Sequence, residues 1–196
     1  MAAGNNLAPG LLLAAPNLRD PNFKKTVVLL GRQDEEGALG WVVNGRGLAS
    51  VTELFATSGL FDEGTTYPDT APFRRIASLG GPVAPATGWL IYRPSPGKDE
   101  LPGQMELADD LAVTGEAAAF CTFIEGTAAL DFRLVLGCAG WAPGQLEAEI
   151  GEGAWLPAPL DVDLLFEFEG DLAWDEAYRR AIGLAPAAFS GRPAKA

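Results

Sequence analysis

Histidine is absent from the 196-residue sequence, and cysteine occurs only twice. Without histidine, the commonest general base of enzymes, the usual catalytic triads and most zinc sites are excluded. The two cysteines, Cys121 and Cys138, lie in apolar surroundings without metal-ligand spacing, so we expect buried, reduced thiols, with a redox pair as the alternative. Any catalysis would therefore depend on carboxylates, cysteine, lysine or an external cofactor.

Long hydrophobic runs are also missing. The longest runs, such as residues 27–30 (VVLL), are far shorter than the roughly 20 residues that cross a bilayer. The first residues carry no positive charge of the kind that begins a secretory signal. We therefore expect no membrane partner and a cytoplasmic location. The length and the 48% hydrophobic content predict a single domain with a sizeable core.

Positive charge is scarce, and its distribution is uneven. The net charge is −12, with residues 1–98 contributing +1 and residues 99–196 contributing −13. This balance disfavours nucleic acid as a partner, because such binding depends on Lys and Arg that neutralise phosphates. A local basic surface in the first half remains open, and its candidates are Lys24, Lys25, Arg32, Arg74 and Arg75.

Apolar runs and turn residues predict a mixture of strands and helices. We expect strands over residues 10–14, 26–31, 38–44, 75–79, 87–92 and 132–136. We expect helices over 51–57, behind the Ser50–Glu53 capping box, over 116–125, from Pro143, and from Asp171. Strands and helices do not alternate strictly, which favours an α+β fold with a mixed sheet. Residues 1–183 are predicted to form one domain, followed by a loose tail over 184–196.

The last predicted helix explains the Arg179–Arg180 dyad. One face of this helix is apolar and carries Trp174, Ala177, Tyr178, Ala181 and Ile182. Asp175 and Glu176 lie four residues before the two arginines, a spacing that favours ion pairs on a helix surface. We therefore interpret these arginines as solvated helix charges, not as a nucleic-acid site.

Residues 141–150 (WAPGQLEAEI) contain the densest set of polar side chains beside aromatic surface. With Ala142 as the helix cap, Gln145 can reach back to its amide, and Trp141 and Leu146 have the spacing of a hydrophobic staple. Alternatively, the free N–H groups of the helix start face a pocket where Gln145 and Trp141 position an anion or a peptide carboxylate. Both interpretations are retained.

Residues 80–83 (GGPV) predict a sharp turn that ends a strand. They lack the lysine and hydroxyl residue of a phosphate-binding loop, so nucleotide binding is not expected. Asn44, at the end of an apolar strand, is either a turn residue, which we favour, or a polar group that points into the same pocket. The predicted binding surface comprises Asn44, Gly80, Gly81, Pro82, Trp141, Gln145 and Glu149.

No converging catalytic set is visible in the sequence. Glu147 and Glu149 lie two apart on a predicted helix and point away from each other, and Cys121 has no histidine partner. We predict no catalytic residue, metal or cofactor, and we favour a non-enzymatic binding or regulatory protein whose partner is a protein or a small ligand. The alternatives are a DNA-associated regulator and a carboxylate-based hydrolase. The oligomeric state stays open.

Four segments in order carry a family resemblance: 10–23 (GLLLAAPNLRDPNF), 37–44 (GALGWVVN), 80–83 (GGPV) and 137–150 (GCAGWAPGQLEAEI). With Trp155–Leu156 and Leu164–Phe166, they resemble the AlgH/YqgE family of bacterial proteins. The resemblance implies a bent or barrel-like mixed sheet flanked by helices, in proteins sometimes called transcriptional regulators. The chain departs from the family pattern at Arg32, where relatives often have histidine, at Cys138 and at Gly153.

Overall fold

A computed structural model describes residues 6–62, 64–97, 99–126 and 131–186, apart from the side chains of 125 and 126. These residues form strands β1 (Gly10–Ala14), β2 (Val27–Asp34), β3 (Gly37–Val42), β4 (Gly47–Ser50), β5 (Ile76–Leu79), β6 (Val83–Tyr92), β7 (Met105–Ala108), β8 (Leu111–Thr114), β9 (Phe132–Trp141) and β10 (Trp155–Ala158). They also form helices α1 (Val51–Thr57), α2 (Ala71–Arg74), α3 (Ala117–Gly126), α4 (Gln145–Gly151), α5 (Val162–Glu167) and α6 (Gly170–Ile182).

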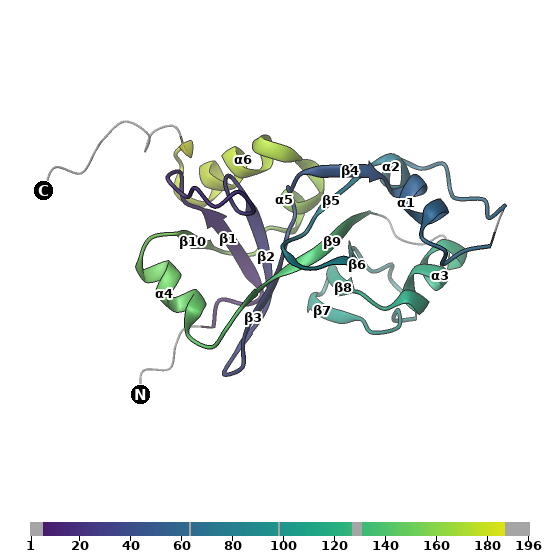
Figure 1. The fold of residues 1–196 in the computed structure, drawn as a ribbon, viewed down its shortest axis with the longest axis horizontal. Coiled ribbons are helices and arrows are strands. Elements are labelled where there is room, and N and C mark those ends of the chain that lie inside the picture. Colours follow the sequence, from purple (N-terminus) through teal and green to yellow (C-terminus); the bar gives the residue numbers. More distant parts are fainter. Residues whose placement is uncertain (1–5, 63, 98, 127–130, 187–196) are drawn as a thin grey trace, which may run out of the picture.

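One sheet joins all ten of these strands. Its main path runs β10-β1-β2-β3-β9-β6-β8-β7, while β5 pairs with β9 and β4 pairs with β5. The β5–β9 pair is parallel and the others are antiparallel, so the sheet is mixed. In Figure 1, β9 crosses the middle of the molecule and connects β1, β2, β3 and β10 on one side with β6, β7 and β8 on the other.

The sheet is bent, because its two ends contribute to the same core. One hydrophobic cluster combines Leu11 of β1 with Leu111 of β8, and Met105 of β7 and Leu156 of β10 pack against it. The path nevertheless keeps two ends, β10 and β7, and is not closed. The predicted α+β fold, with a mixed, bent or barrel-like sheet flanked by helices, is confirmed, and the sheet is of the bent, open kind.

The strands near the amino terminus are covered on both faces, as their continuous apolar sequence predicts. In β2, Val27 and Leu29 belong to the core that α5 and α6 cover. Val28 and Leu30, on the opposite face, belong to a second core that includes Leu146 of α4. This double coverage explains why β2 shows no alternation of polar and apolar residues.

Helix boundaries follow the capping signals closely. Helix α1 begins behind the Ser50–Glu53 capping box, and α6 ends at Gly183, which adopts the left-handed conformation. The indole of Trp174 and the hydroxyl of Tyr178 both donate hydrogen bonds to the Ala14 carbonyl and fix α6 on β1. The apolar stripe predicted for this helix is wrong at its end, because Ala181 and Ile182 are exposed beyond the contact with β1.

The largest difference from the sequence prediction lies around Gly137. Strand β9 does not end at residue 136 but continues to Trp141, which pairs with Ala38. Gly137 allows this continuation because its φ of +75° lets the strand bend without ending. Helix α4 accordingly begins after the left-handed Gly144, two residues later than expected from Pro143.

The predicted tail over 184–196 lies mostly outside the described residues, and the prediction of one domain over 1–183 stays a prediction. The short elements β4, β7, β8, β10, α2 and α5 were not predicted from the sequence. Among the residues that the structure describes, no helix has the length and apolarity that a membrane crossing requires.

Candidate functional site

The predicted binding surface separates into two places in the structure. The Val42 amide at the end of β3 donates a hydrogen bond of 2.8 Å to the Gly80 carbonyl, so Asn44 lies near the glycine pair. Trp141 pairs with Ala38 at the opposite end of β3. Ala38 lies four residues from Val42, which is about 13 Å at the usual rise per residue of a strand. Asn44 and the glycines therefore do not form one site with Trp141, Gln145 and Glu149.

The buried side chain of Asn44 forms hydrogen bonds with three backbone segments. Its side-chain oxygen accepts from the Val27 amide at 2.7 Å, and its nitrogen donates to the Lys25 carbonyl at 3.0 Å and the Gly170 carbonyl at 2.9 Å. The side chain thus holds the start of β2 against the start of α6. Its polar atoms are engaged inside the protein and are not directed at a ligand.

The glycine pair allows the chain to pass close to β9. A Cβ atom at Gly80 would lie 2.5 Å from the Gly137 carbonyl oxygen, and one at Gly81 would lie 2.2 Å from that of Cys138. Gly81 also has a φ of +148°, which other residues rarely adopt. Pro82 follows on the surface, in agreement with the predicted turn. Close packing of the backbone is sufficient to explain this motif.

A cluster of hydrogen bonds surrounds the Glu149 carboxylate. One oxygen accepts from the indoles of Trp141 at 2.9 Å and Trp155 at 2.8 Å, while the other accepts from Gln145 at 2.9 Å. The side-chain oxygen of Gln145 accepts from the Ala142 amide at 3.0 Å, as the sequence analysis expected. We call Trp141, Gln145, Glu149 and Trp155 the Glu149 cluster.

The Glu149 cluster stabilises the negative charge of the Glu149 carboxylate, and this charge would repel a bound anion. Burial alone would raise the pKa of Glu149, but the hydrogen bonds from Trp155, Gln145 and Trp141 outweigh burial and lower it. The carboxylate is therefore charged at neutral pH and is unsuited to act as a general acid. An anion at the start of α4 would also meet this charge, which argues against the anion pocket considered from the sequence.

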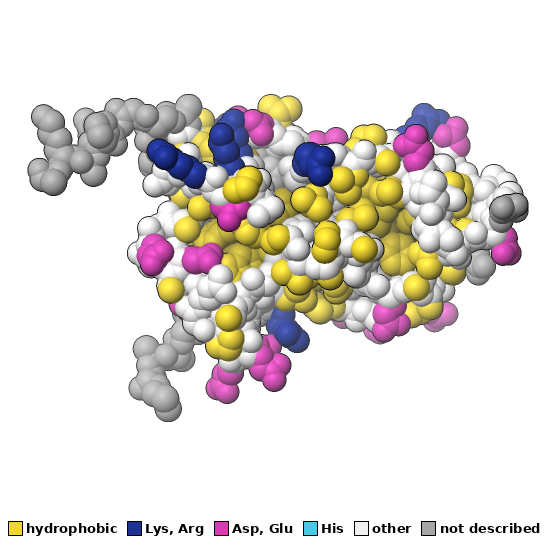
Figure 2. Space-filling model, in the orientation of Figure 1, with side chains coloured by type: hydrophobic (Ala, Val, Ile, Leu, Met, Phe, Trp, Pro, Cys, Tyr) yellow, Lys and Arg dark blue, Asp and Glu magenta, His cyan; other side chains and the backbone are white. Residues whose placement is uncertain are grey.

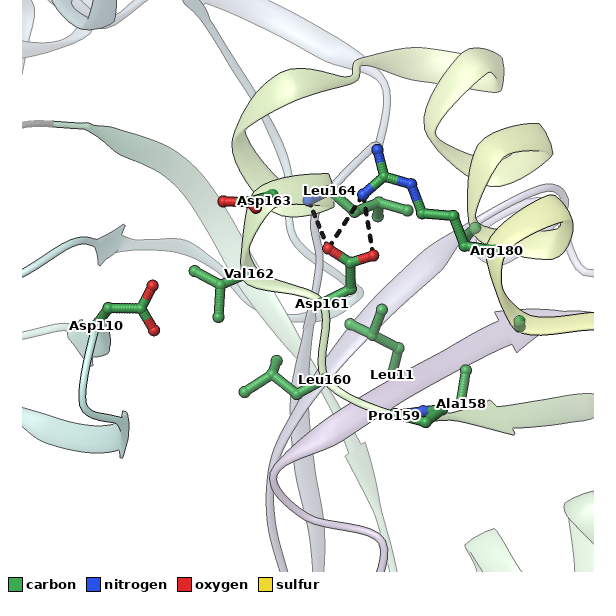
Figure 3. Close-up of a pocket in the computed structure, with 12 residues that line it drawn as sticks. Leu11, Asp110, Ala158, Pro159, Leu160, Asp161, Val162, Asp163, Leu164 and Arg180 are labelled. Atoms are coloured by element: carbon green, nitrogen blue, oxygen red, sulfur yellow. Dashed lines mark hydrogen bonds and ion pairs between the residues drawn. The ribbon is translucent and has the colours of Figure 1, made fainter.

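A cavity of about 380 Å³ lies elsewhere, between the two ends of the bent sheet (Figure 3). It is bounded by β1 and the end of β10, by α5 and α6, and by the turn between β7 and β8. Its apolar lining consists of Leu11, Ala158, Pro159, Leu160, Val162, Leu164, Ala177 and Ala181. Its charged lining consists of Asp110, Asp161, Asp163 and Arg180.

Two arginines organise the charged rim of the cavity. Arg180 contacts Asp161 at 3.0 Å, Glu167 at 3.1 Å and Glu176 at 2.9 Å. The hydrogen bonds that Arg180 donates, first of all the one to Glu176, raise its pKa, so its charge is permanent. The predicted Glu176–Arg180 pair is thereby confirmed, whereas Arg179 pairs with Glu176 in place of Asp175.

The second arginine, Arg93, joins the β7–β8 turn to α5. Its two terminal nitrogens each lie 2.5 Å from a carboxylate oxygen, one of Asp110 and one of Asp163. Its guanidinium group also lies over the Phe166 ring, 5.2 Å from the centroid. Arg93 therefore crosses the rim and holds one wall of the cavity against another.

The cavity residues differ in how much of their bonding capacity is used. Asp161 accepts from the Leu164 amide at 3.0 Å, as the N-cap of α5, and from Arg180. Within the described part of the chain, Asp110 and Asp163 each form an ion pair with Arg93 alone, and their side chains are 54% and 71% exposed. Since an ionised carboxylate has about four acceptor positions, these two retain unused acceptors at the mouth.

The lining combines apolar groups with paired charges. Among the described residues, no cysteine, serine, threonine or lysine contributes to it, and its carboxylates are joined to arginines. Over residues 6–62, 64–97, 99–126 and 131–186, no three acidic or cysteine side chains are arranged to hold a metal ion. The lining therefore presents apolar surface and paired charged groups.

The basic candidates for nucleic-acid binding are mostly neutralised by acidic neighbours. Lys25 pairs with Asp171, Arg32 with Asp34, Arg74 with Asp69 and Arg75 with Asp131, at 2.5–3.2 Å. Lys24 is exposed. The paired cations provide little positive potential for a phosphate backbone.

Sequence reasoning missed the buried Arg133, although its place within the apolar run FRLVL is itself a signal. Its guanidinium donates to the carbonyls of Leu165 and Phe168 and thereby holds the end of α5. Burial lowers its pKa to about 10. The cavity was missed as well, and the available signal was Asp161, an N-cap residue before the apolar run of α5.

The same fold and sequence features occur in known proteins. Residues 11–185 match the sequence profile of the AlgH-like family. This chain belongs to the AlgH-like family. Its relatives include a UPF0301 protein of Anaeromyxobacter sp. strain K, 40% identical over 187 residues, which cover 93% of this chain and 91% of the relative. A UPF0301 protein of Idiomarina loihiensis is 36% identical over 174 residues, covering 88% and 90%.

Solved structures of similar proteins share the fold. The solution structure of AlgH from Pseudomonas aeruginosa has a TM-score of 0.73 and 27% identity, covering all of this chain and 99% of that one. A crystal structure of a Corynebacterium diphtheriae protein has a TM-score of 0.72 and 23% identity, covering 92% and 90%. The AlgH-like relatives named here are bacterial, and their names assign no activity.

Proposed function

We propose that this AlgH-like protein is a non-enzymatic binding protein and that the cavity between β10, α5, α6 and the β7–β8 turn is its binding site. The observation that supports the proposal is an open cavity with an apolar floor and unused acceptors at its mouth. Its volume of about 380 Å³ is near the lower end of the range for ligand sites. This size suits a small molecule or one or two side chains of a partner.

The binding role is proposed to be regulatory and to take place in the cytoplasm. Both cysteines are free, which agrees with a reducing compartment. Nucleic acid is not the proposed partner, because the net charge is −12 and four of the five candidate cations are paired. We expect no salt-sensitive retention on DNA at low salt.

Filling the cavity tests the proposal. A titration with 1-hexanol, followed by the amide resonances, should give saturable shifts confined to residues that line the cavity. Ala181→Trp should abolish them, because Ala181 lines the cavity from the exposed end of α6. Ala148→Trp, on the exposed face of α4, is the matched control and should leave them unchanged. Equal shifts in both variants, or none in the wild type, would contradict the proposal.

A further inference from the structure

Resting on the proposed function, we infer that the occupant of the cavity is a basic side chain, lysine or arginine, presented by a segment of a protein partner. The inference rests on three features of the site. These are the excess of negative charge at the rim, the apolar floor beneath it, and the two sheet edges on either side. Each feature is independent of the others.

Negative charge predominates at the rim. Five carboxylates surround three guanidinium groups there, those of Asp110, Asp161, Asp163, Glu167 and Glu176 around Arg93, Arg179 and Arg180. The half of the chain that supplies all five carboxylates, residues 99–196, carries a net charge of −13. This field attracts a cationic side chain and repels an anionic one, and complementary charge favours association with the matching partner.

The unused acceptors lie where an incoming cation would arrive. Asp110 stands across the cavity from Val162 in Figure 3, and its carboxylate is directed toward α5. Asp163 extends from the first turn of α5, and both carboxylates are more than half exposed. Each carboxylate uses one oxygen for its ion pair with Arg93, so an ammonium or guanidinium group at the mouth could bind the acceptor positions that Arg93 leaves unused.

The floor of the cavity complements the stem of a basic side chain. Leu11, Leu160 and Leu164 line it beneath the charged mouth. Lysine and arginine bury their methylene groups against apolar surface while the charged end stays near water. A small anion or a polar sugar would leave this floor without a partner, whereas an alkyl stem that ends in a cation matches both layers.

The position of the cavity favours a partner chain over a free amine. It adjoins the last residue of β10 and the β7–β8 turn. Among the described strands, β10 and β7 are the two ends of the sheet path, and each is paired with a neighbouring strand along one edge. Strands at the end of a sheet offer backbone groups to an extended segment, and alternate side chains of that segment then enter nearby pockets. A peptide backbone along such an edge would place its basic side chain in the cavity.

The experiment compares peptides that differ in one charge. The capped pentapeptide Ala-Leu-Lys-Leu-Ala and the same peptide with Nε-acetyl-lysine are titrated against the full chain, followed by amide resonances. We expect the lysine peptide to bind about fivefold tighter at low salt, as for one partly exposed ion pair, and the preference to shrink at high salt. In Asp110→Asn/Asp163→Asn the preference should disappear, while binding of 1-hexanol is retained.

The outcomes separate the inference from the proposed function. Equal affinity for the two peptides, with 1-hexanol still bound, would overturn the inference that the occupant is a basic side chain. The cavity would remain a binding site. If n-hexylamine binds as tightly as the lysine peptide, the inference of a protein partner is overturned and a free amine is the occupant. Absence of binding by 1-hexanol and by every charged probe would overturn the proposed function itself.

Discussion

The Glu149 cluster and the cavity both bring polar groups against apolar surface, and they differ in how fully those polar groups are bonded. In the Glu149 cluster, both carboxylate oxygens and the donors around them are joined to one another. At the cavity, Asp110 and Asp163 keep exposed acceptors beside open space. A binding site is therefore indicated by polar groups with unused bonding capacity beside a cavity, and not by a high density of polar residues. Changes to the cluster should therefore cost stability, and changes to the cavity should cost binding.

The largest loss of stability is expected from Glu149→Ala. This change leaves the indole N–H groups of Trp141 and Trp155 without their acceptor, at a cost of about 3 kcal/mol in the free energy of unfolding. Glu147→Ala, two residues earlier and exposed, should change it by about 0.5 kcal/mol or less. Urea denaturation measures both. Similar values for the two variants would contradict the structural role of the cluster.

Asn44→Ala should have the next largest effect. It removes the acceptor of the buried Val27 amide and the donor to Gly170, so we expect a loss of about 2 kcal/mol in unfolding free energy. Asn22→Ala, at an exposed position of the preceding turn, is the control. A loss as small as that of the control would show that Asn44 is not needed to join β2 to α6.

Acid should lower the free energy of unfolding by a smaller amount than Glu149→Ala, because protonation of Glu149 leaves its side chain in place. The lowered pKa of Glu149 means that its stabilising effect is present above the ordinary value of 4.5 and is lost as the pH falls below it. The stability difference between the wild type and Glu149→Gln should therefore shrink on going from about pH 6 to pH 3. A difference that stays constant over this range would refute the charged state of Glu149.

The smallest effect on stability is expected in the cavity. Ala181→Trp alters an exposed helix position, so the unfolding free energy should change by about 0.5 kcal/mol or less, while binding of 1-hexanol is lost. Thermal denaturation and the titration are measured on the same sample. If this variant loses as much stability as Glu149→Ala, the two regions do not differ as described.

Local signals in the sequence predicted much of the fold. The capping box at Ser50 and Glu53 fixed the start of α1, and Gly183 fixed the end of α6, because both act through neighbouring backbone groups. The contact from Gln145 to the Ala142 amide was also predictable. The start of α4 was not, because the bend at Gly137 lets pairing with β3 carry β9 onward to Trp141.

The cavity could not be predicted in the same way. Its lining comes from four separated parts of the chain, residue 11, residue 110, residues 158–164 and residues 177–181. Tertiary packing of short elements brings these parts together, and none of them carries a motif that indicates ligand binding. The sequence motif WAPGQLEAEI drew attention to Glu149 because polar residues are dense there, but the structure joins them to each other.

Mapping of the amide resonances during titration with the lysine pentapeptide locates the binding site. Binding in the cavity should give saturable shifts at Leu11, at Asp110, over residues 160–164 and over residues 177–181, with the resonances of α4 unmoved. Shifts centred on residues 141–149, with the cavity resonances unchanged, would contradict it and return the binding surface to the Glu149 cluster.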